Sequence, residues 1–270
     1  MGATLKILHI WNTAGVASTI AKFMDRLYST ESMILMRALK DQFKLTYYGG
    51  PSINLGSKHF IIHAIIEARK YDIIHVHYYD RIIPFIKGIY NNKKVIMHYH
   101  GDDIRKKWEE KRERWMRTNA IIISTADLLD GAPFGVIYIP NPIDTELFQP
   151  MLEQRRFNTA LHITYSRYQN DKDLELVKEW ADKERVKLTV INRDESPVPF
   201  LEMPRLLNRF EFFVDRFTIP SLSKTALEAL ACGIKVVAWN GEIVEKLPED
   251  NKPEIVVQRV YNLYKKILDN

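Results

Sequence analysis

The segment SLSKTALEALACG, residues 221–233, places polar and charged side chains at the start of a predicted helix that is otherwise small and apolar. Ser223 is a predicted N-cap, and the backbone amides that follow it at Lys224 and Thr225 have no partner inside a helix. Such amides bind phosphate. Glu228 lies one turn further on, where a carboxylate can accept two hydrogen bonds from a ribose diol. An unpaired glutamate in so apolar a helix would be costly, which favours a bound ligand over a solvated side chain.

Two cations and a glycine are further candidates for contact with phosphate. Arg167 and Lys172 flank a turn between a predicted strand and a predicted helix, where they could neutralise a diphosphate, although such pairs are commonly solvated. Gly15 follows the first predicted strand near a helix start, so it is either a phosphate-binding turn or a plain tight turn. The sequence has no G-x-G-x-x-G motif, which argues against a nicotinamide-dependent dehydrogenase.

Two pairs of histidines lie in predicted strands, His75 with His77 and His98 with His100. We expect the two members of each pair to face opposite sides of the sheet. His100, at its strand end and before Gly101, is then expected to face a ligand cleft, where it can donate to a sugar hydroxyl or to a developing charge. For His75 and His77 we expect structural roles with satisfied hydrogen bonds.

Three other side chains could bind metal or react. Asp102 and Asp103 are adjacent on a loop and do not converge on one ion without help, so we expect one of them to be an N-cap and neither to bind a metal. Cys232 is the single cysteine and lies in an alanine-rich helix, so we expect a small buried side chain instead of a reactive thiol. A chain with one cysteine has no internal disulfide, which favours a reducing compartment such as the cytoplasm.

Apolar runs rich in β-branched residues alternate with amphipathic segments through the first half of the chain. Such alternation is typical of an α/β fold with a doubly wound parallel sheet. The predicted strands are 5–11, 43–49, 72–78, 94–100, 120–125 and 135–140, with helices at 16–28 and 59–71.

The proline-rich segment 139–150 has neither a helical nor a strand period, which indicates a boundary. Beyond it the alternation resumes with strands at 159–166, 186–192, 212–217 and 235–239 and helices at 172–184, 203–210 and 224–233. We therefore expect an N-terminal Rossmann-like domain at 1–150, a C-terminal one at 151–252, and a closing helix within 253–270 that packs back on the first domain.

The composition excludes some classes of protein and leaves others open. The chain has 270 residues, 46% hydrophobic and 27% charged, which is ordinary for a globular protein and excludes disorder. Its net charge of +5 suits nucleotide phosphate, a membrane surface or nucleic acid equally. The basic segment 104–117, with Trp108 and Trp115, is either a salt-bridged helix with its tryptophans in the core or a surface for anionic lipid or an anionic acceptor.

Taken together, the chain resembles GT-B glycosyltransferases of the retaining family 4, or group 1, type. The resemblance covers nearly the whole chain. The chain is shorter than is usual for the family, which suggests an archaeal or archaeal-viral member. The motifs that carry it are HGDD at 100–103, STADLL at 124–129, IPNPIDTELF at 139–148, SR…K at 166–172 and, most specifically, ALEALACGIKVVA at 226–238.

The resemblance implies two Rossmann-like domains whose parallel sheets face a cleft, and transfer of a sugar from a nucleoside-diphosphate donor to a glycan, lipid or protein acceptor. It implies no cofactor and no obligatory metal, because fixed cations and helix amides stabilise the leaving diphosphate. It places the base near residues 191–200. By role, the implied residues are Gly15, Arg167, Lys172, Lys224 and Thr225 at the diphosphate, Glu228 at the ribose and His100 as the catalytic residue beside the sugar. We also expect Ser221, Ser223 and Asp102 on the donor-sugar side.

One position departs from the family pattern. The family pattern has two glutamates separated by seven residues. When Glu228 is taken as the second glutamate, the first falls on Pro220. Serines at 221 and 223 replace the glycines that flank this position in the family. The missing glutamate normally binds the transferred sugar, so the identity of the sugar is affected more than nucleotide binding. A degenerate GT-B protein that binds without transfer is therefore an alternative. A GT-B epimerase would need a further carboxylate constellation, and a nucleic-acid-binding protein an aromatic platform, and neither pattern is seen.

Overall fold

The computed structural model describes residues 4–151, 155–165 and 171–269. The chain divides into two compact units: unit 1 comprises Met1–Pro142 and Pro253–Asn270, and unit 2 comprises Ile143–Lys252. Residues 143–150 belong to unit 2 because they are fixed within it. The amide of Ile143 donates to the Asn251 carbonyl (3.0 Å), and the Phe148 and Phe200 rings lie 5.4 Å apart.

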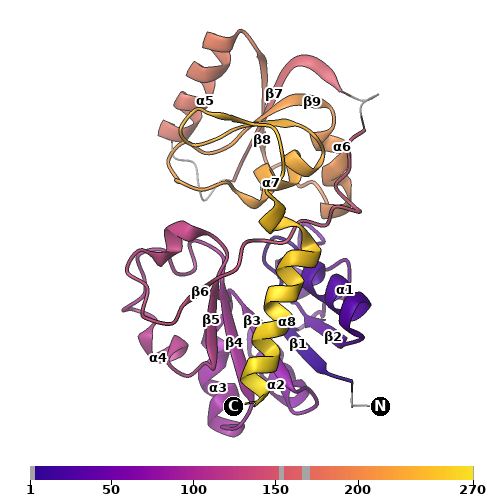
Figure 1. Ribbon diagram of the computed structural model, residues 1–270, viewed down its shortest axis with the longest axis vertical. Coiled ribbons are helices and arrows are strands. Elements are labelled where there is room, and N and C mark those ends of the chain that lie inside the picture. Colours follow the sequence, from indigo (N-terminus) through magenta and orange to yellow (C-terminus); the bar gives the residue numbers. More distant parts are fainter. Residues whose placement is uncertain (1–3, 152–154, 166–170, 270) are drawn as a thin grey trace. The chain divides into compact units, whose positions relative to one another are not determined.

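Unit 1 is built on a six-stranded sheet in the order β2-β1-β3-β4-β5-β6, in which all neighbouring strands are parallel (Figure 1). The strands are β1 Lys6–Ile10, β2 Glu31–Leu35, β3 Ile73–His77, β4 Lys94–Tyr99, β5 Ala120–Ile123 and β6 Ile137–Tyr138. The chain passes from β1 to β2 on one side and continues with β3 on the other. The carboxyl ends of β1 and β3 are therefore the switch point of the sheet, the usual place for a ligand in such folds.

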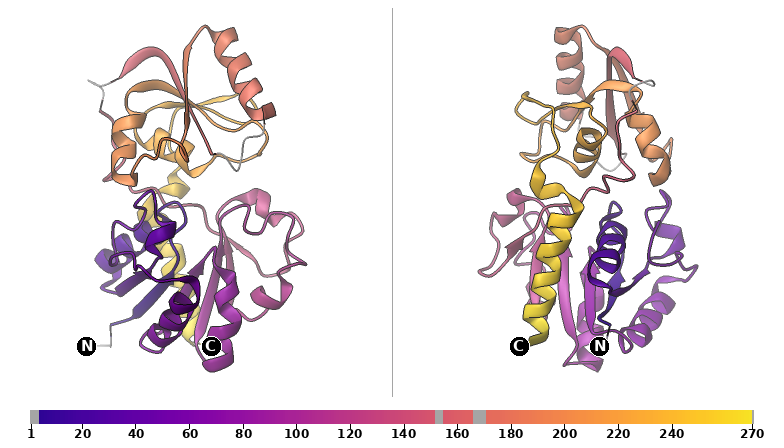
Figure 2. Two further views of the ribbon diagram at one scale, coloured as in Figure 1. Left: turned by 180° about the vertical axis from the view of Figure 1, so that it is seen from behind. Right: turned by 45° about the vertical axis from the view of Figure 1, so that its right-hand side comes forward.

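Helices cover both faces of this sheet (Figure 2). The alternating residues of each strand separate into two cores. Leu8, Ile74 and Met97 pack with α2 (Ser57–Ala68) and with α3 (Ile83–Ile89). Ile7, Ile73 and Ile96 face the opposite way and pack with α1 (Val16–Tyr28) and α8 (Pro253–Asp269), whose Val256, Val260 and Leu263 are buried on one face.

Two expected elements of unit 1 were wrong. Residues 43–49 are a loop, because the Asp41 carboxylate accepts hydrogen bonds from the amides of Leu45 (2.6 Å) and Thr46 (3.3 Å). The strand is β2, at residues 31–35. Within 104–117 only α4, Arg112–Trp115, is an α-helix.

The two tryptophans of segment 104–117 point inward, which agrees with the interpretation that places them in the core. Trp108 is buried and donates from Nε1 to the Leu128 carbonyl (3.1 Å), and Trp115 donates to the Trp108 carbonyl (2.8 Å). The segment also forms longer-range ion pairs, since Lys111 and Arg114 both bind the buried Asp80 carboxylate, at 2.8 and 3.0 Å.

Unit 2 is built on a five-stranded sheet in the order β11-β10-β9-β7-β8, parallel except for the β10–β11 pair. Its strands are β7 Arg156–Thr164, β8 Lys187–Asn192, β9 Phe210–Val214, β10 Lys235–Val237 and β11 Ile243–Val244, and its helices are α5 Asp171–Glu184, α6 Met203–Leu207 and α7 Lys224–Ala231. Ala160, Val177, Val214 and Val237 form its core. The expected second Rossmann-like alternation is present.

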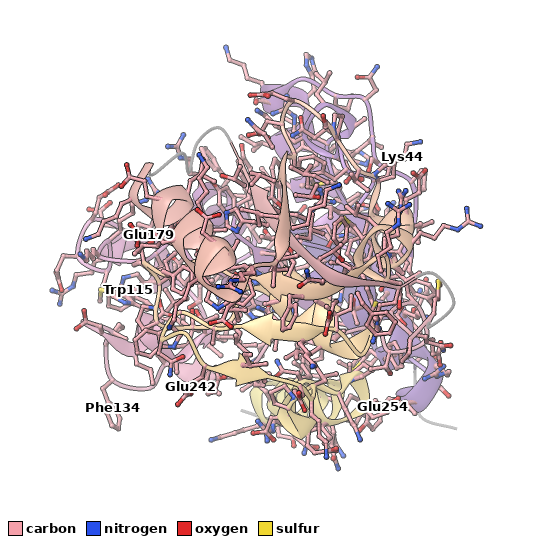
Figure 3. The ribbon with its side chains drawn as sticks, turned by 90° about the horizontal axis from the view of Figure 1, so that it is seen from above. Lys44, Trp115, Phe134, Glu179, Glu242 and Glu254 are labelled. Carbon is pink, nitrogen blue, oxygen red and sulfur yellow. The ribbon has the colours of Figure 1, made fainter. Side chains whose placement is uncertain are left out.

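Short 3-10 helices complete the two units: η1 Ala38–Lys40, η2 Asp80–Ile82, η3 Ala126–Leu129, η6 Phe200–Glu202 and η7 Glu249–Asn251. The side chain of Phe134, in the loop after η3, projects fully into solvent (Figure 3). Among the described residues, none of the helices combines the length and the apolar character that crossing a bilayer requires.

Candidate functional site

In unit 2 the segments that follow three neighbouring strands carry the described candidate residues. Strands β7, β8 and β9 are parallel neighbours, so the segments that follow them leave the sheet at the same edge. Tyr165 follows β7, Arg193 follows β8 and Asp215 follows β9. Lys224 and Thr225, at the start of α7, come at the end of the third of these segments.

The segment that leads into α7 is fixed by two buried carboxylates that the sequence analysis did not identify. Asp215 accepts a hydrogen bond from the amide of Ser223 (2.7 Å). Asp173, on α5, accepts from the amides of Phe217 and Thr218 (both 2.9 Å) and from the Thr218 hydroxyl. Burial raises the pKa of Asp215 in spite of its hydrogen bond to Ser223. The start of α7 is thus held by contacts within unit 2.

Ser223 is the N-cap of α7, as predicted. Its Oγ accepts a hydrogen bond from the amide of Ala226 (3.1 Å) and its backbone is extended. The capping contact occupies the hydroxyl that we assigned to the donor-sugar side. Ser221 and Thr225 are partly exposed, and Pro220 is exposed.

Lys224 and Glu228 contact each other. The ammonium lies 2.5 Å from the carboxylate, both side chains are more than nine-tenths buried, and the ammonium also lies 5.2 Å from the centre of the Phe200 ring. The argument that Glu228 lacks a partner within the protein was therefore wrong, because Lys224 supplies one. The contacts of Lys224 with phosphate and of Glu228 with ribose stay predictions.

The remaining candidates of unit 2 are less completely described. Lys172 is exposed in the first turn of α5, and Arg167 lies outside the described residues. In the segment expected near the base, Arg193 is buried. Its guanidinium donates to the Tyr165 hydroxyl (3.2 Å) and to the Val198 carbonyl (2.8 Å), so it fixes the turn after β8. A lone arginine in a polar loop gave no sequence signal for this role.

In unit 1, Gly15 precedes α1 with a left-handed backbone (φ 75°), a conformation that favours glycine. The side chain of Asn12, which the sequence analysis also missed, accepts from the amide of Ala17 (3.0 Å) and donates to the Leu45 carbonyl (2.9 Å). Asn12 therefore fixes the start of α1 against the loop that contains Leu45. Gly15 as a diphosphate contact stays a prediction.

His100 lies just beyond the end of β4 and is half-buried, with its Nε2 3.1 Å from Nδ1 of His77. The rings of His98 and His100 stack with their centres 4.2 Å apart, and so do the rings of His75 and His77. The expectation that each pair faces opposite sides was wrong, because side-chain direction in a strand repeats every two residues.

The two aspartates after His100 have separate structural roles. Asp102 pairs with Arg105 (2.8 Å), which also pairs with Asp127 (2.7 Å). Asp103 is buried and accepts from the backbone amides of His100 and Gly101, which precede it. Neither is the cap of a following helix, because residues 102–106 form turns and the next α-helix, α4, begins only at Arg112; this expectation was wrong.

Asp103 makes stability depend on pH. Burial raises the pKa of its carboxyl to about 6 from 3.8, outweighing the hydrogen bonds from His100 and Gly101. The folded chain then binds the proton more tightly than the unfolded chain, so this contribution is complete below pH 3.8 and is lost as the pH rises through about 6. At about 1.4 kcal/mol per pKa unit, it amounts to roughly 2–3 kcal/mol.

We expect Asp103→Asn, which resembles the protonated carboxyl, to gain stability relative to the wild type as the pH rises from 4 to 7. Urea unfolding of both proteins at several pH values gives the difference between their free energies of unfolding. Contributions from groups that the two proteins share cancel in this difference. Asp102→Asn, at a neighbouring side chain that is 39% exposed, is the matched control for the change from a carboxylate to an amide. A constant difference for Asp103→Asn across this range would contradict the raised pKa.

The sequence matches no model of a protein family, and no curated protein sequence matches it. Several solved structures superpose on nearly the whole chain. AviGT4, a glycosyltransferase involved in avilamycin A biosynthesis, gives a TM-score of 0.59 at 12% identity over 98% of each chain. The chain has the GT-B fold.

Two other structures support the GT-B assignment. Sucrose-phosphate synthase from Thermosynechococcus elongatus gives a TM-score of 0.53 at 11% identity, over 98% of this chain and 92% of that one. S. aureus MnaA in complex with UDP gives 0.51 at 14% identity, over 98% and 90%. The two parallel sheets described above are the two Rossmann-like halves of this GT-B chain.

Proposed function

We propose that this protein is a glycosyltransferase that moves a sugar from a nucleoside-diphosphate donor to an acceptor. The observation that carries the proposal is the match in fold, over almost the whole length, to the glycosyltransferase AviGT4. The fixed start of α7 in unit 2 supports it, because Asp215 and Asp173 hold that segment at the edge of the sheet where a nucleotide would bind.

The roles follow the sequence prediction with one refinement. The diphosphate contacts Gly15, Arg167, Lys172 and the start of α7, where Lys224 and Thr225 lie. Glu228 holds the ribose through Oε2, since its ion pair with Lys224 is formed by Oε1. The buried pair would fix the carboxylate in place before the nucleotide arrives, which reduces the entropy lost on binding.

In the proposed reaction the leaving diphosphate is stabilised by fixed cations and helix amides, and transfer is retaining and independent of metal. His100 would lie beside the donor sugar, and Ser221, Ser223 and Asp102 would line that side. The hydroxyl of Ser223 caps α7, so its contribution to sugar binding would come from its backbone. We place the protein in the cytoplasm, with peripheral contact to a membrane as an option for a lipid acceptor.

Pro220 favours a second candidate function, binding of a nucleotide or sugar without transfer. Pro220 is exposed and offers no side-chain acceptor where the family pattern has a glutamate. Hydrolysis of the donor separates the two candidates: a transferase should release nucleotide slowly from its donor without an acceptor, and a degenerate binder should not.

The test is stabilisation by nucleotides. UDP, GDP, ADP and dTDP are compared with UDP-sugars in thermal unfolding, with UDP first because MnaA binds it. A ligand at a hundred times its dissociation constant adds about 2.7 kcal/mol to stability. We expect at least one nucleotide to do so, and the double variant Arg167→Ala, Lys172→Ala to abolish the effect.

The matched control is Lys178→Ala, Lys183→Ala, which removes the same charge from exposed positions further along α5. This variant should keep the shift. No shift with any nucleotide at millimolar concentration would contradict both the transferase and the binding candidate. A shift that survives in the Arg167, Lys172 variant would mean that the phosphates bind elsewhere.

A further inference from the structure

Five of the chain's eight histidines gather on three adjacent strands of unit 1. We call them the imidazole cluster: His9 on β1, His75 and His77 on β3, His98 on β4 and His100 just beyond it. His9 pairs in register with His75, and His77 with His98. On β1, β3 and β4 the cluster begins two residues after Ile7, Ile73 and Ile96, on the same sheet face, which α1 and α8 cover. It extends to the carboxyl ends of β1 and β3, where the switch point of the sheet lies.

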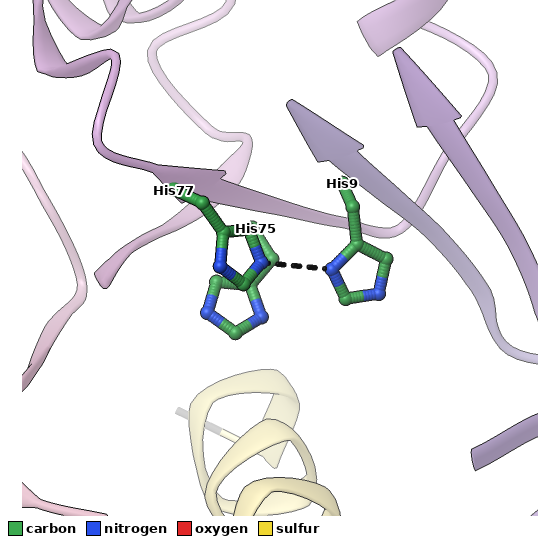
Figure 4. Close-up of side chains that lie close together, drawn as sticks. All are labelled: His9, His75 and His77. Atoms are coloured by element: carbon green, nitrogen blue, oxygen red, sulfur yellow. Dashed lines mark hydrogen bonds between the residues drawn. The ribbon is translucent and has the colours of Figure 1, made fainter. Parts of the chain in front are cut away.

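Three members of the cluster present ring nitrogens to a common point (Figure 4). One nitrogen each of His9, His75 and His77 lies within 4.8 Å of the others, and Nδ1 of His9 lies 3.1 Å from Nε2 of His77. Two imidazoles bound to one tetrahedral ion, with bonds of about 2.0–2.1 Å, have their nitrogens roughly 3.3 Å apart. One separation already matches, and ring rotations can close the others.

The second nitrogens of two of these rings are held as metal-binding histidines require. Nδ1 of His75 lies 2.6 Å from the Tyr264 hydroxyl, which α8 provides. Nδ1 of His77 lies 3.1 Å from Nε2 of His100. A ligating histidine usually donates its other N–H to such a partner, which fixes the tautomer and the ring direction.

Hydrogen bonds within the described part of the chain do not satisfy the cluster. Nε2 of His9, Nε2 of His75 and both ring nitrogens of His98 are buried and have no hydrogen-bond partner there. A native protein rarely leaves buried polar atoms unsatisfied. An ion bound by Nδ1 of His9 and by Nε2 of His75 and His77 would satisfy Nε2 of His75, and buried water is the usual partner for the others.

We propose that His9, His75 and His77 bind one transition-metal ion of the zinc type, with Tyr264 and His100 as the outer partners of His75 and His77. Three nitrogen ligands without a carboxylate exclude Mg²⁺ and Ca²⁺, which need oxygen ligands. The ion joins β1 to β3 and, through Tyr264, fixes α8 on the sheet. It is a structural ion in unit 1 and takes no part in the transfer chemistry proposed above.

Binding of Co²⁺ and Zn²⁺ to the full chain, purified without a histidine tag and treated with a chelator, tests the proposal. We expect one Co²⁺ per chain, with the intense visible absorption of a tetrahedral site, and its displacement by Zn²⁺. We also expect Zn²⁺ to raise the melting temperature. These measurements use the wild-type protein, so they do not depend on whether any variant folds. Absence of Co²⁺ absorption and of Zn²⁺ uptake would overturn the proposal. The cluster would then be a chain of hydrogen-bonded imidazoles without a metal.

Two variants and a control assign the site. His75→Ala, His77→Ala should lose the bound Co²⁺, whereas His59→Ala, His63→Ala, on α2, should retain it. Tyr264→Phe keeps the ring and removes only the hydroxyl, so it should fold and bind Co²⁺ about 10- to 100-fold more weakly. Unchanged affinity in Tyr264→Phe, or loss of binding in the α2 variant, would contradict this assignment. Nucleotide shifts measured with and without metal keep the result separate from the proposed transferase activity.

Discussion

Replacing His100 by alanine is expected to slow sugar transfer by about 10²- to 10⁴-fold, the usual contribution of a positioned proton donor or acceptor. The affinity for the nucleotide should stay nearly unchanged, because the predicted phosphate and ribose contacts lie on other residues. His100 is half-buried at the end of β4, and its Nε2 contacts His77, which fixes the ring direction. Nucleotide released from the donor gives the rate, and thermal stabilisation by the free nucleotide gives the affinity.

His100→Gln is the matched variant, since its amide can keep a polar contact with His77 while losing the imidazole. It should fold as well as the wild type and remain slow. Both variants are assayed after chelator treatment, so that a change in metal affinity does not enter the rates. A fall in nucleotide affinity equal to the fall in rate would show that His100 acts by supporting the fold, and an unchanged rate would remove it from the proposed site.

Breaking the Lys224–Glu228 ion pair on one side is expected to lower the free energy of unfolding by about 3–5 kcal/mol, because the partner keeps a buried and uncompensated charge. Lys224→Met leaves the Glu228 carboxylate, and Glu228→Gln leaves the ammonium, in a site where both side chains are more than nine-tenths buried. The double variant removes both charges and should cost much less than the sum of the two. Denaturant unfolding of the four proteins gives the coupling energy.

The same four proteins test whether Glu228 also binds ribose. The double variant should fold yet discriminate less between UDP and 2′-deoxy-UDP, because a neutral glutamine amide accepts the hydroxyl more weakly than a carboxylate does. Unchanged discrimination in the double variant would show that the pair serves the fold alone. The surface pair Lys252–Glu249, whose side chains are 46% and 73% exposed, is the control and should show little coupling when changed in the same way.

Sequence patterns predicted the central strands well and the edge of the sheet poorly. Strands β3, β4 and β5 are buried on both faces and appear as continuous apolar runs. Strand β2 is half exposed, begins with Glu31 and Ser32, and buries only its last two residues, so its pattern is weak. The aromatic segment 43–49 looked more like a strand, but the Asp41 side chain holds it as a loop, a contact that no local propensity reveals.

The charged segment 104–117 shows how tertiary contacts override a helical pattern. Its charges have helical spacing, yet Lys106 adopts a left-handed backbone (φ 59°), which an α-helix does not contain. Lys111 and Arg114 contact Asp80 instead of their neighbours in the segment. Since Asp80 lies far back in the sequence, spacing within the segment gave no indication of it.

The candidate site was predicted in part. The cap of α7 was predicted from its sequence. The spacing of the two histidine pairs was interpreted wrongly as placing their members on opposite faces, whereas the two-residue period of a strand places all four imidazoles on one face. The position of His9 in the cluster could not be predicted from spacing, because it depends on strand order. Strand β1 lies beside β3 in the sheet although β2 comes between them in the sequence. Asp173 and Tyr264 come from helices far from their partners, and single residues of these types carry no pattern.

The return of the chain to unit 1 reverses the order in which the two units can be completed during synthesis. Unit 1 begins first, but α8 supplies one of the helices that cover its sheet, and α8 follows every residue of unit 2. Domains tend to fold as units as they leave the ribosome. Unit 2, whose residues 143–252 are contiguous, can therefore fold while the nascent unit 1 still exposes Ile7, Ile73 and Ile96. Until α8 has been made, the face of the unit 1 sheet that α8 covers lacks that helix.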